Sequence, residues 1–187
     1  MRSVINDVFY SVYQYLGFGI IFAVICMVAL PTVRKEGVLK TIRKIYCSLK
    51  ISRQYRSRFF FFTYFFMVLA RTLICRNIWK CPWENVIGNW GIYTADGGYN
   101  TEGALNTLLF FPMTFFYLKG FRTTQYRTIE SKKILMKMTM DSFLFSTLIE
   151  LCQLFLRLGT FQLSDIFQNT LGGLMGAILF VILNNRK

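Results

Sequence analysis

Long apolar runs separated by clusters of basic residues constrain the fold of this chain more than any other feature. The first run, Val8 to Leu30, holds about 23 residues with few polar side chains, enough for a helix to cross a ~30 Å hydrocarbon layer. Only helices and closed barrels satisfy their backbone groups in lipid, so the sequence predicts an all-α integral membrane protein, a bundle of about five transmembrane helices. The other four spans are expected at Phe59 to Cys75, Ala104 to Leu118, Met138 to Leu156 and Ile166 to Leu183.

Composition agrees with this class. The chain of 187 residues is 54% hydrophobic and 18% aromatic, with a mean hydropathy of +0.41, so no large soluble core is left over. The first run lies where a secretory signal would lie. Its apolar region is too long for one, no small-x-small cleavage pattern follows it, and the basic cluster comes after the run, so we expect a retained helix.

The placement of Lys and Arg orients the predicted bundle. Cytoplasmic loops collect these residues, so the N-terminus is expected outside and the C-terminus in the cytoplasm, as five spans require. We divide the chain into a first transmembrane helix (1–33), a basic cytoplasmic loop or amphipathic segment (34–58) and a domain with four transmembrane helices (59–187). Most of the 22 Lys and Arg residues lie in two connections and the C-terminus: Arg34, Lys35, Lys40, Arg43, Lys44, Lys50, Arg53, Arg56, Arg58, Lys119, Arg122, Arg127, Lys132, Lys133, Lys137, Arg186 and Lys187.

The net charge of +13 does not indicate a nucleic-acid partner. Topology explains the charge, and no zinc-finger spacing, helix-turn-helix or RNA-binding aromatic motif accompanies it. The basic segment from Thr41 to Arg58 alternates basic and apolar residues. It is either an amphipathic helix drawn to anionic lipid at the inner leaflet or an ordinary solvated loop.

The chain has no histidine, and its five cysteines form no CxxC pair, so we expect no metal site and no cofactor. The lack of histidine also excludes Ser-His-Asp and Cys-His catalysis. Any acid or base must therefore be a carboxylate, Lys, Tyr or Cys. Cys75 and Cys81 both fall near the expected outer surface, and the sequence leaves open whether they form a disulfide.

Polar residues form a stripe on the fourth expected helix. Ser146, Glu150, Gln153 and Arg157 fall within about 60° of one another at ~100° per residue. An ionisable group inside an apolar run is costly unless it has a partner or a water-lined cavity, so Glu150 marks a candidate functional site.

The fifth expected helix carries a second polar face. Asp165, Asn169, Gly172 and Gly176 share this face, and Gly173 lies beside them. The GxxxG step from Gly172 to Gly176 lets helices approach closely in lipid, so we expect this face to pack inside the bundle. Asp165 also suits the role of a helix cap.

The predicted topology brings polar residues of four spans to one level near the outer leaflet. Two interpretations stay open. In the first, Glu150 pairs with Arg71 or Arg157 and the pair holds the bundle together. In the second, the residues form a pocket for a phosphorylated or peptide-bearing lipid, whose phosphate or carboxylate groups guanidinium groups bind in bidentate fashion. The residues at this level are Arg71, Arg76, Glu102, Asn106, Glu150, Gln153, Arg157, Asp165 and Asn169.

Three segments resemble the VanZ-like membrane proteins, a family named for a teicoplanin-resistance factor. They are LNTLLFFPMTFFYL (Leu105 to Leu118), IELCQLFLRLGTFQLSD (Ile149 to Asp165) and NTLGGLMG (Asn169 to Gly176). The E-x-x-Q pair and the aspartate four residues before N-T-x-G-G are the most specific parts. The resemblance covers about Phe59 to Leu183.

Similar features of the family precede these segments, namely the Arg71-Thr72 pair and WGIYTADG (Trp90 to Gly97). One departure is Thr114, which follows Pro112 and Met113 where the family usually has glycine, so the bend of the third helix is in question.

The resemblance implies a multi-pass protein of the bacterial, Gram-positive cell membrane, linked to reduced susceptibility to teicoplanin-type glycopeptide antibiotics, without an established reaction. One hypothesis is an accessory factor that binds membrane lipid or a lipid-linked cell-wall precursor at the outer leaflet. The alternative is a membrane-embedded enzyme that modifies a lipid headgroup, with Glu150 or Asp165 as base. Five short helices without an internal repeat argue against a transporter. The oligomeric state stays open.

Overall fold

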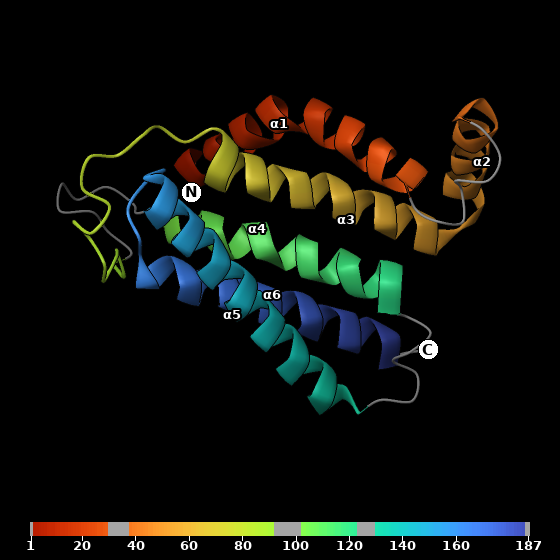
Figure 1. Cartoon of the computed structure of the whole chain (residues 1–187). Coiled ribbons are helices and arrows are strands. Elements are labelled where there is room, and N and C mark those ends of the chain that lie inside the picture. Colours follow the sequence, from red (N-terminus) through yellow and green to blue (C-terminus); the bar gives the residue numbers. More distant parts are fainter. Residues whose placement is uncertain (1, 30–37, 92–101, 123–129, 186–187) are drawn as a thin grey trace.

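The computed structural model describes residues 2–29, 38–91, 102–122 and 130–185, and all regular structure in them is helical, as the sequence predicts. Figure 1 shows the chain. The elements are α1 (Arg2–Ala29), α2 (Val38–Ile51), α3 (Arg53–Leu69), the π-helix η1 (Ala70–Ile74), α4 (Glu102–Tyr117), the π-helix η2 (Leu118–Arg122), α5 (Ser131–Leu156) and α6 (Leu163–Asn185).

Three of the described helical segments are long and apolar enough to cross a membrane. They are Arg53–Ile74, which joins α3 and η1, Ser131–Leu156, which is α5, and Leu163–Asn184, in α6. The apolar part of α1, Tyr13–Ala29, is shorter, and α4 has 16 residues. The chain thus has the helices of a membrane protein, while the five-span count and the orientation of the termini stay predictions.

The helices form a bundle in which some neighbours in space are consecutive helices of the sequence and others are not. Contacts link α1 with α3, α3 with α4, α4 with α6, and α6 with α5, and Figure 1 shows α5 crossing the others obliquely. Buried Val68, Phe110 and Ile149 join α3, α4 and α5 in one apolar cluster. A second cluster around Met138 and Phe180 joins α5 and α6. Apolar packing between distant segments therefore sets the positions of the helix ends.

The close approach of α4 and α6 depends on two glycines. A β-carbon at Gly172 would overlap the carbonyl oxygen of Thr107, and a β-carbon at Gly176 would overlap that of Phe111. Both glycines are buried. The GxxxG step therefore packs α6 against the backbone of α4 within one chain.

Thr114 stands where the resemblance led us to look for glycine. Helix α4 nevertheless continues through Pro112 as far as Tyr117, and Thr114 is buried. Its hydroxyl oxygen would lie 3.4 Å from a β-carbon built on Gly173 of α6, which also leaves space for the hydroxyl of Ser142. The threonine therefore fits without interrupting α4, and the space left by Gly173 is filled by Ser142.

Part of the basic connection folds into helix α2, which is joined to α3 by one residue. Ser52 accepts a hydrogen bond from the backbone N–H three residues later, at 3.4 Å, and so caps α3. Arg56 donates to the carbonyls of Leu49 and Lys50 at 3.0 and 2.9 Å and so satisfies the end of α2. The first turn of α3 carries two basic residues, Arg53 and Arg56.

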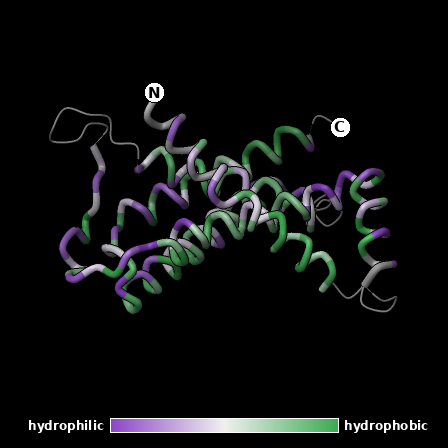
Figure 2. Tube along the Cα trace, turned by 90° about the horizontal axis from the view of Figure 1, so that it is seen from above, coloured by the Kyte–Doolittle hydropathy of each residue, from purple (hydrophilic) through white to green (hydrophobic). Residues whose placement is uncertain are grey.

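Figure 2 shows hydrophilic residues along α2 and, at the other end of the bundle, in the connections. Contact of α2 with the membrane surface stays a prediction.

Candidate functional site

One end of the bundle carries the polar residues that the sequence singled out. η1 and α5 end there, and α4 and α6 begin there, opposite α2 and the last turn of α6 (Figure 1). We call it the polar end. It holds Arg71 in η1, Arg76 after it, Glu102 and Asn106 in α4, Glu150 and Gln153 in α5, Arg157 just beyond α5, and Asp165 and Asn169 in α6.

Glu150 is enclosed, with only 2% of its surface exposed. Its Oε2 accepts a hydrogen bond of 2.8 Å from the backbone N–H of Gln162, in the connection between α5 and α6. A bond from an N–H group to a carboxylate is stronger than one between neutral groups. The partner that the structure assigns to Glu150 is thus a backbone amide, whereas one of the two open interpretations paired it with Arg71 or Arg157. No local sequence pattern indicates this partner.

Gln153 is 1% exposed and joins α5 to η1. Its Nε2 donates to the carbonyl of Thr72 at 2.8 Å. That carbonyl lies in the π-helix, which the bond from the N–H of Cys75 to the carbonyl of Ala70, at 2.9 Å, closes. Because carbonyls at a helix end lack partners within the helix, a buried glutamine amide is a suitable donor for one of them. Gln153 thus ties two helix ends together below the surface.

Asn169 and Ser146 join α6 to α5 deeper in the bundle. The Nδ2 of Asn169 donates to the Oγ of Ser146 at 2.9 Å, and both residues are buried. The Oδ1 of Asn169 is also buried and has no hydrogen-bond partner among the described residues. Most buried polar atoms have a partner, so this unsatisfied oxygen is an exception within the part of the chain that the structure describes.

A second network joins α4, α6 and the connection after η1. The Nδ2 of Asn106 donates to the Oε1 of Gln168 at 3.4 Å, and the Nε2 of Gln168 donates to the carbonyl of Asn89 at 3.5 Å. The Nδ2 of Asn89 in turn donates to the Oε2 of Glu102 at 3.3 Å. Neither Gln168 nor Asn89 is among the residues predicted from the sequence. Gln168 follows Asp165 by one helical turn, and this spacing could have indicated that Gln168 lies at the polar end.

Arg76 is the cation that acts electrostatically on both Glu150 and Asp165. Its guanidinium would lie 3.0 Å from a β-carbon built on Gly159, which has a φ of +147°. Only glycine adopts such a backbone without strain, and here it also leaves room for the arginine. Glu102 acts on Asp165 as well, with the opposite sign of charge. The polar end thus contains the exposed guanidinium of Arg76 near the buried Glu150 and the half-buried Asp165.

Arg157 does not continue the buried stripe of α5. Helix α5 ends at Leu156, and Arg157 is its C-cap, with a left-handed φ of 54° and an exposed side chain. The left-handed residue turns the chain out of the helix, so the regular spacing of side chains stops there. The stripe therefore consists of Ser146, Glu150 and Gln153, which are buried.

Backbone hydrogen bonds hold the connection between α5 and α6 (157–162) against the segment that follows η1. The N–H of Trp79 donates to the carbonyl of Arg157 at 2.7 Å, and the N–H of Phe161 donates to the carbonyl of Pro82 at 2.9 Å. The start of α6 is bound in the same way, from the N–H of Leu163 to the carbonyl of Val86 at 2.9 Å. These bonds determine where the amide that binds Glu150 lies.

The cysteines do not form the disulfide that the sequence left open, because Cys75 and Cys81 are free thiols, like the other three cysteines. Within the described ranges, no group of three His, Cys, Asp or Glu side chains is arranged to hold a metal ion. Residues 92–97 of the WGIYTADG segment lie outside the described residues.

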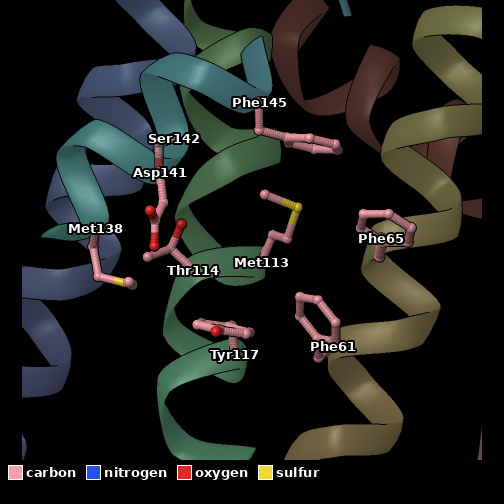
Figure 3. Close-up of a pocket in the computed structure, with 9 residues that line it drawn as sticks. All are labelled: Phe61, Phe65, Met113, Thr114, Tyr117, Met138, Asp141, Ser142 and Phe145. Carbon is pink, nitrogen blue, oxygen red and sulfur yellow. The ribbon is translucent and has the colours of Figure 1, made fainter. Parts of the chain in front are cut away.

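A cavity of about 240 Å³ lies between α3, α4 and α5, away from the polar end (Figure 3). None of the residues predicted for the site lines this cavity. Its walls are mostly aromatic and methionine side chains, with the Asp141 carboxylate and the Thr114 hydroxyl turned toward each other in Figure 3. The polar end is thus a separate feature of the molecule.

The polar end offers both signs of charge and neutral hydrogen-bonding groups. Guanidinium groups bind phosphate and carboxylate groups, whereas carboxylates accept from hydroxyl or ammonium groups. Such a mixture suits a polar headgroup that carries donors and acceptors together.

Comparison with known proteins agrees with the motifs at this end. Neither a curated protein nor a solved structure matches the chain. One family model does match, VanZ/LLP1, over residues 18–184. The match begins inside the first apolar run, well before Phe59, where the resemblance quoted above begins, and it includes α2 and every residue of the polar end. The chain therefore belongs to the VanZ/LLP1 family.

Proposed function

We propose that this VanZ-like protein is a multi-pass protein of a Gram-positive cell membrane, with five spans, the N-terminus outside and the C-terminus in the cytoplasm. The polar end then faces the outer leaflet. The distribution of charge supports this orientation, because α2 and the start of α5 carry basic residues at the opposite end, including Arg43, Lys50 and Lys133.

In this orientation the protein acts as an accessory factor that binds membrane lipid or a lipid-linked cell-wall precursor, and thereby lowers susceptibility to teicoplanin-type (lipo)glycopeptides. The enclosure of Glu150 at a helix end, with Arg76 acting on it and on Asp165, carries the proposal. A purely structural ion pair needs one acid and one base, whereas this end holds a surplus of both. Phosphate on the lipid would meet Arg76, and hydroxyl or amine groups would meet the carboxylates.

The test at the level of the cell compares inhibitory concentrations of teicoplanin in a sensitive Gram-positive host. The host expresses the native chain, Glu150→Gln, or Glu130→Gln, an exposed carboxylate that pairs with Lys133 at the other end. We expect the native chain and Glu130→Gln to protect, and Glu150→Gln to lose protection at equal membrane abundance. Equal protection by all three chains would remove the polar end from the function.

The test at the level of the molecule is direct binding of a lipid-linked wall precursor to purified protein in nanodiscs. Arg76→Ala should weaken this binding, because it removes the cation that acts on the site. Arg43→Ala, an exposed residue of α2, is the matched control. Equal affinities of the two variants would contradict recognition of phosphate by Arg76.

The presence of the buried Glu150 and the half-buried Asp165 near the guanidinium of Arg76 also favours a second candidate, an enzyme that modifies a lipid headgroup. Glu150 or Asp165 would act as general base, and Arg76 would stabilise the developing charge. Incubation of labelled lipid with the protein distinguishes the two functions. A new headgroup product that Glu150→Gln fails to make supports the enzyme, and binding without a product supports the accessory factor.

A further inference from the structure

All three tryptophans of the chain lie in one exposed segment at the polar end. We call this segment, residues 76–91, the tryptophan cap; Figure 1 shows it in yellow-green, leaving the end of α3 and η1. Trp79, Trp83 and Trp90 are 46%, 64% and 54% exposed, and Ile78 and Ile87 are 80% and 70% exposed. So much apolar surface on a short irregular segment needs a partner other than water.

The cap is held in place by specific contacts. The Nε1 of Trp90 donates to the carbonyl of Ile87 at 2.8 Å, and its ring lies 5.3 Å from that of Phe167. The ring of Trp83 lies 6.3 Å from that of Phe161. Together with the backbone bonds to residues 157–163, these contacts give the exposed rings defined positions.

The exposed apolar surface continues from the cap onto the neighbouring helix ends. Phe155 and Leu156 at the end of α5 are 80% and 62% exposed, and Phe167 at the start of α6 is 54% exposed. Both helices are long and apolar enough to span a membrane. The cap therefore adjoins the part of the surface where a bilayer passes from hydrocarbon to headgroups.

The charge of the cap complements anionic lipid. Arg76 and Lys80 are exposed in it, Arg157 is exposed beside it, and Glu84 is its one acidic side chain. Tryptophan rings combine an apolar body with an N–H donor and are enriched at the interface between membrane and water. Basic residues are attracted to the same layer when it contains anionic lipid.

We propose that the tryptophan cap lies in the headgroup layer of a bilayer that contains anionic phospholipid. The backbone bonds at Trp79 and Pro82 then hold the connection 157–162 at the same depth, and the bond at Val86 holds the start of α6 there. The amide of Gln162 that binds Glu150 belongs to that connection. The polar end accordingly meets lipid headgroups from the side, within the membrane. This consequence rests on the proposed function, whereas the depth of the cap does not.

The experiment uses the intrinsic fluorescence of the protein, because every tryptophan reports on the cap. The full chain is reconstituted into vesicles of phosphatidylcholine and phosphatidylglycerol. In separate samples the acyl chains carry bromine near the glycerol or near the terminal methyl group. We expect stronger quenching by bromine near the glycerol, and weak quenching by iodide added to the water. Strong quenching by iodide together with none by either brominated lipid would overturn the proposal.

A second comparison tests the preference for anionic lipid. Bromine is placed near the glycerol of either the phosphatidylglycerol or the phosphatidylcholine, at equal mole fraction. We expect the brominated phosphatidylglycerol to quench more, and Lys80→Gln to reduce the difference. Lys133→Gln, at the other end of the bundle, should leave it unchanged. Equal quenching by both lipids in the native protein would refute the charge argument. Neither comparison requires a ligand at Glu150, so failure of the proposed function would not change these results.

Discussion

Two glycines in helices provide a matched test of the packing between α4 and α6. A β-carbon at Gly172 would overlap the carbonyl oxygen of Thr107 and lie 3.1 Å from its Cα, and both atoms belong to the backbone of α4. A β-carbon at Gly17 in α1 meets nothing within 4 Å. Gly172→Ala and Gly17→Ala therefore make the same chemical change in two different surroundings.

Both substitutions stabilise their helix by raising its helix propensity, and only Gly172→Ala also introduces a steric clash that lowers the free energy of unfolding. Replacing glycine by alanine inside a helix stabilises it by about 1 kcal/mol. Overpacking a closely packed site costs about 1–3 kcal/mol, and a clash with backbone lies toward the upper part of that range because a whole helix has to move. We expect Gly17→Ala to raise the free energy of unfolding by up to about 1 kcal/mol. Gly172→Ala should lie about 1–3 kcal/mol below Gly17→Ala.

The assay is reversible unfolding of the purified protein in mixed micelles by titration with sodium dodecyl sulfate, followed by circular dichroism. The shared propensity term cancels in the difference between the variants, so this difference isolates the clash at α4. Equal free energies of unfolding for Gly172→Ala and Gly17→Ala would refute the packing described here.

Three further predictions follow from the contacts of the polar end. Gln153→Leu should lower the free energy of unfolding by about 1–3 kcal/mol, because it leaves a buried carbonyl of η1 without a donor; no loss in the same titration would contradict that bond. A double-mutant cycle with Ser146→Ala and Asn169→Ala should give a coupling energy near 0.6 kcal/mol, typical of hydrogen bonds between membrane helices; a coupling of zero would show that the two residues act independently. Cys75 and Cys81 should both react with a maleimide without prior reduction, as mass spectrometry can measure, and an unlabelled pair would reveal a disulfide.

The sequence was sufficient for the helical class and for much of the polar surface within single helices. Periodicity placed Ser146, Glu150 and Gln153 on one face, and the structure buries all three. Periodicity also placed Asn169 and Gly172 on one face of the last helix, and the structure buries both residues where α6 packs against its neighbours. These features are local, because the angle between side chains on a helix depends only on their spacing.

The regular spacing of side chains stops where a helix ends, and the sequence alone did not predict the structure at the helix ends. Arg157 left the stripe because a left-handed cap turns the chain away from the helix axis. For the basic segment the sequence left an amphipathic helix and a solvated loop open, and the structure makes it α2 and the first turn of α3, with Ser52 and Arg56 satisfying the adjoining helix ends.

The partners across the bundle were decided by the tertiary structure alone. Glu150 binds the backbone of Gln162, Gln153 binds the carbonyl of Thr72, and Arg76 acts on two carboxyl groups of different helices. The partners in each pair belong to different segments of the chain. Each pair therefore depends on how the helices pack and on where the connections between them run. The sequence by itself determined which residues are polar within apolar helices; their partners depended on glycine contacts, apolar clusters and backbone bonds that form only in the folded bundle.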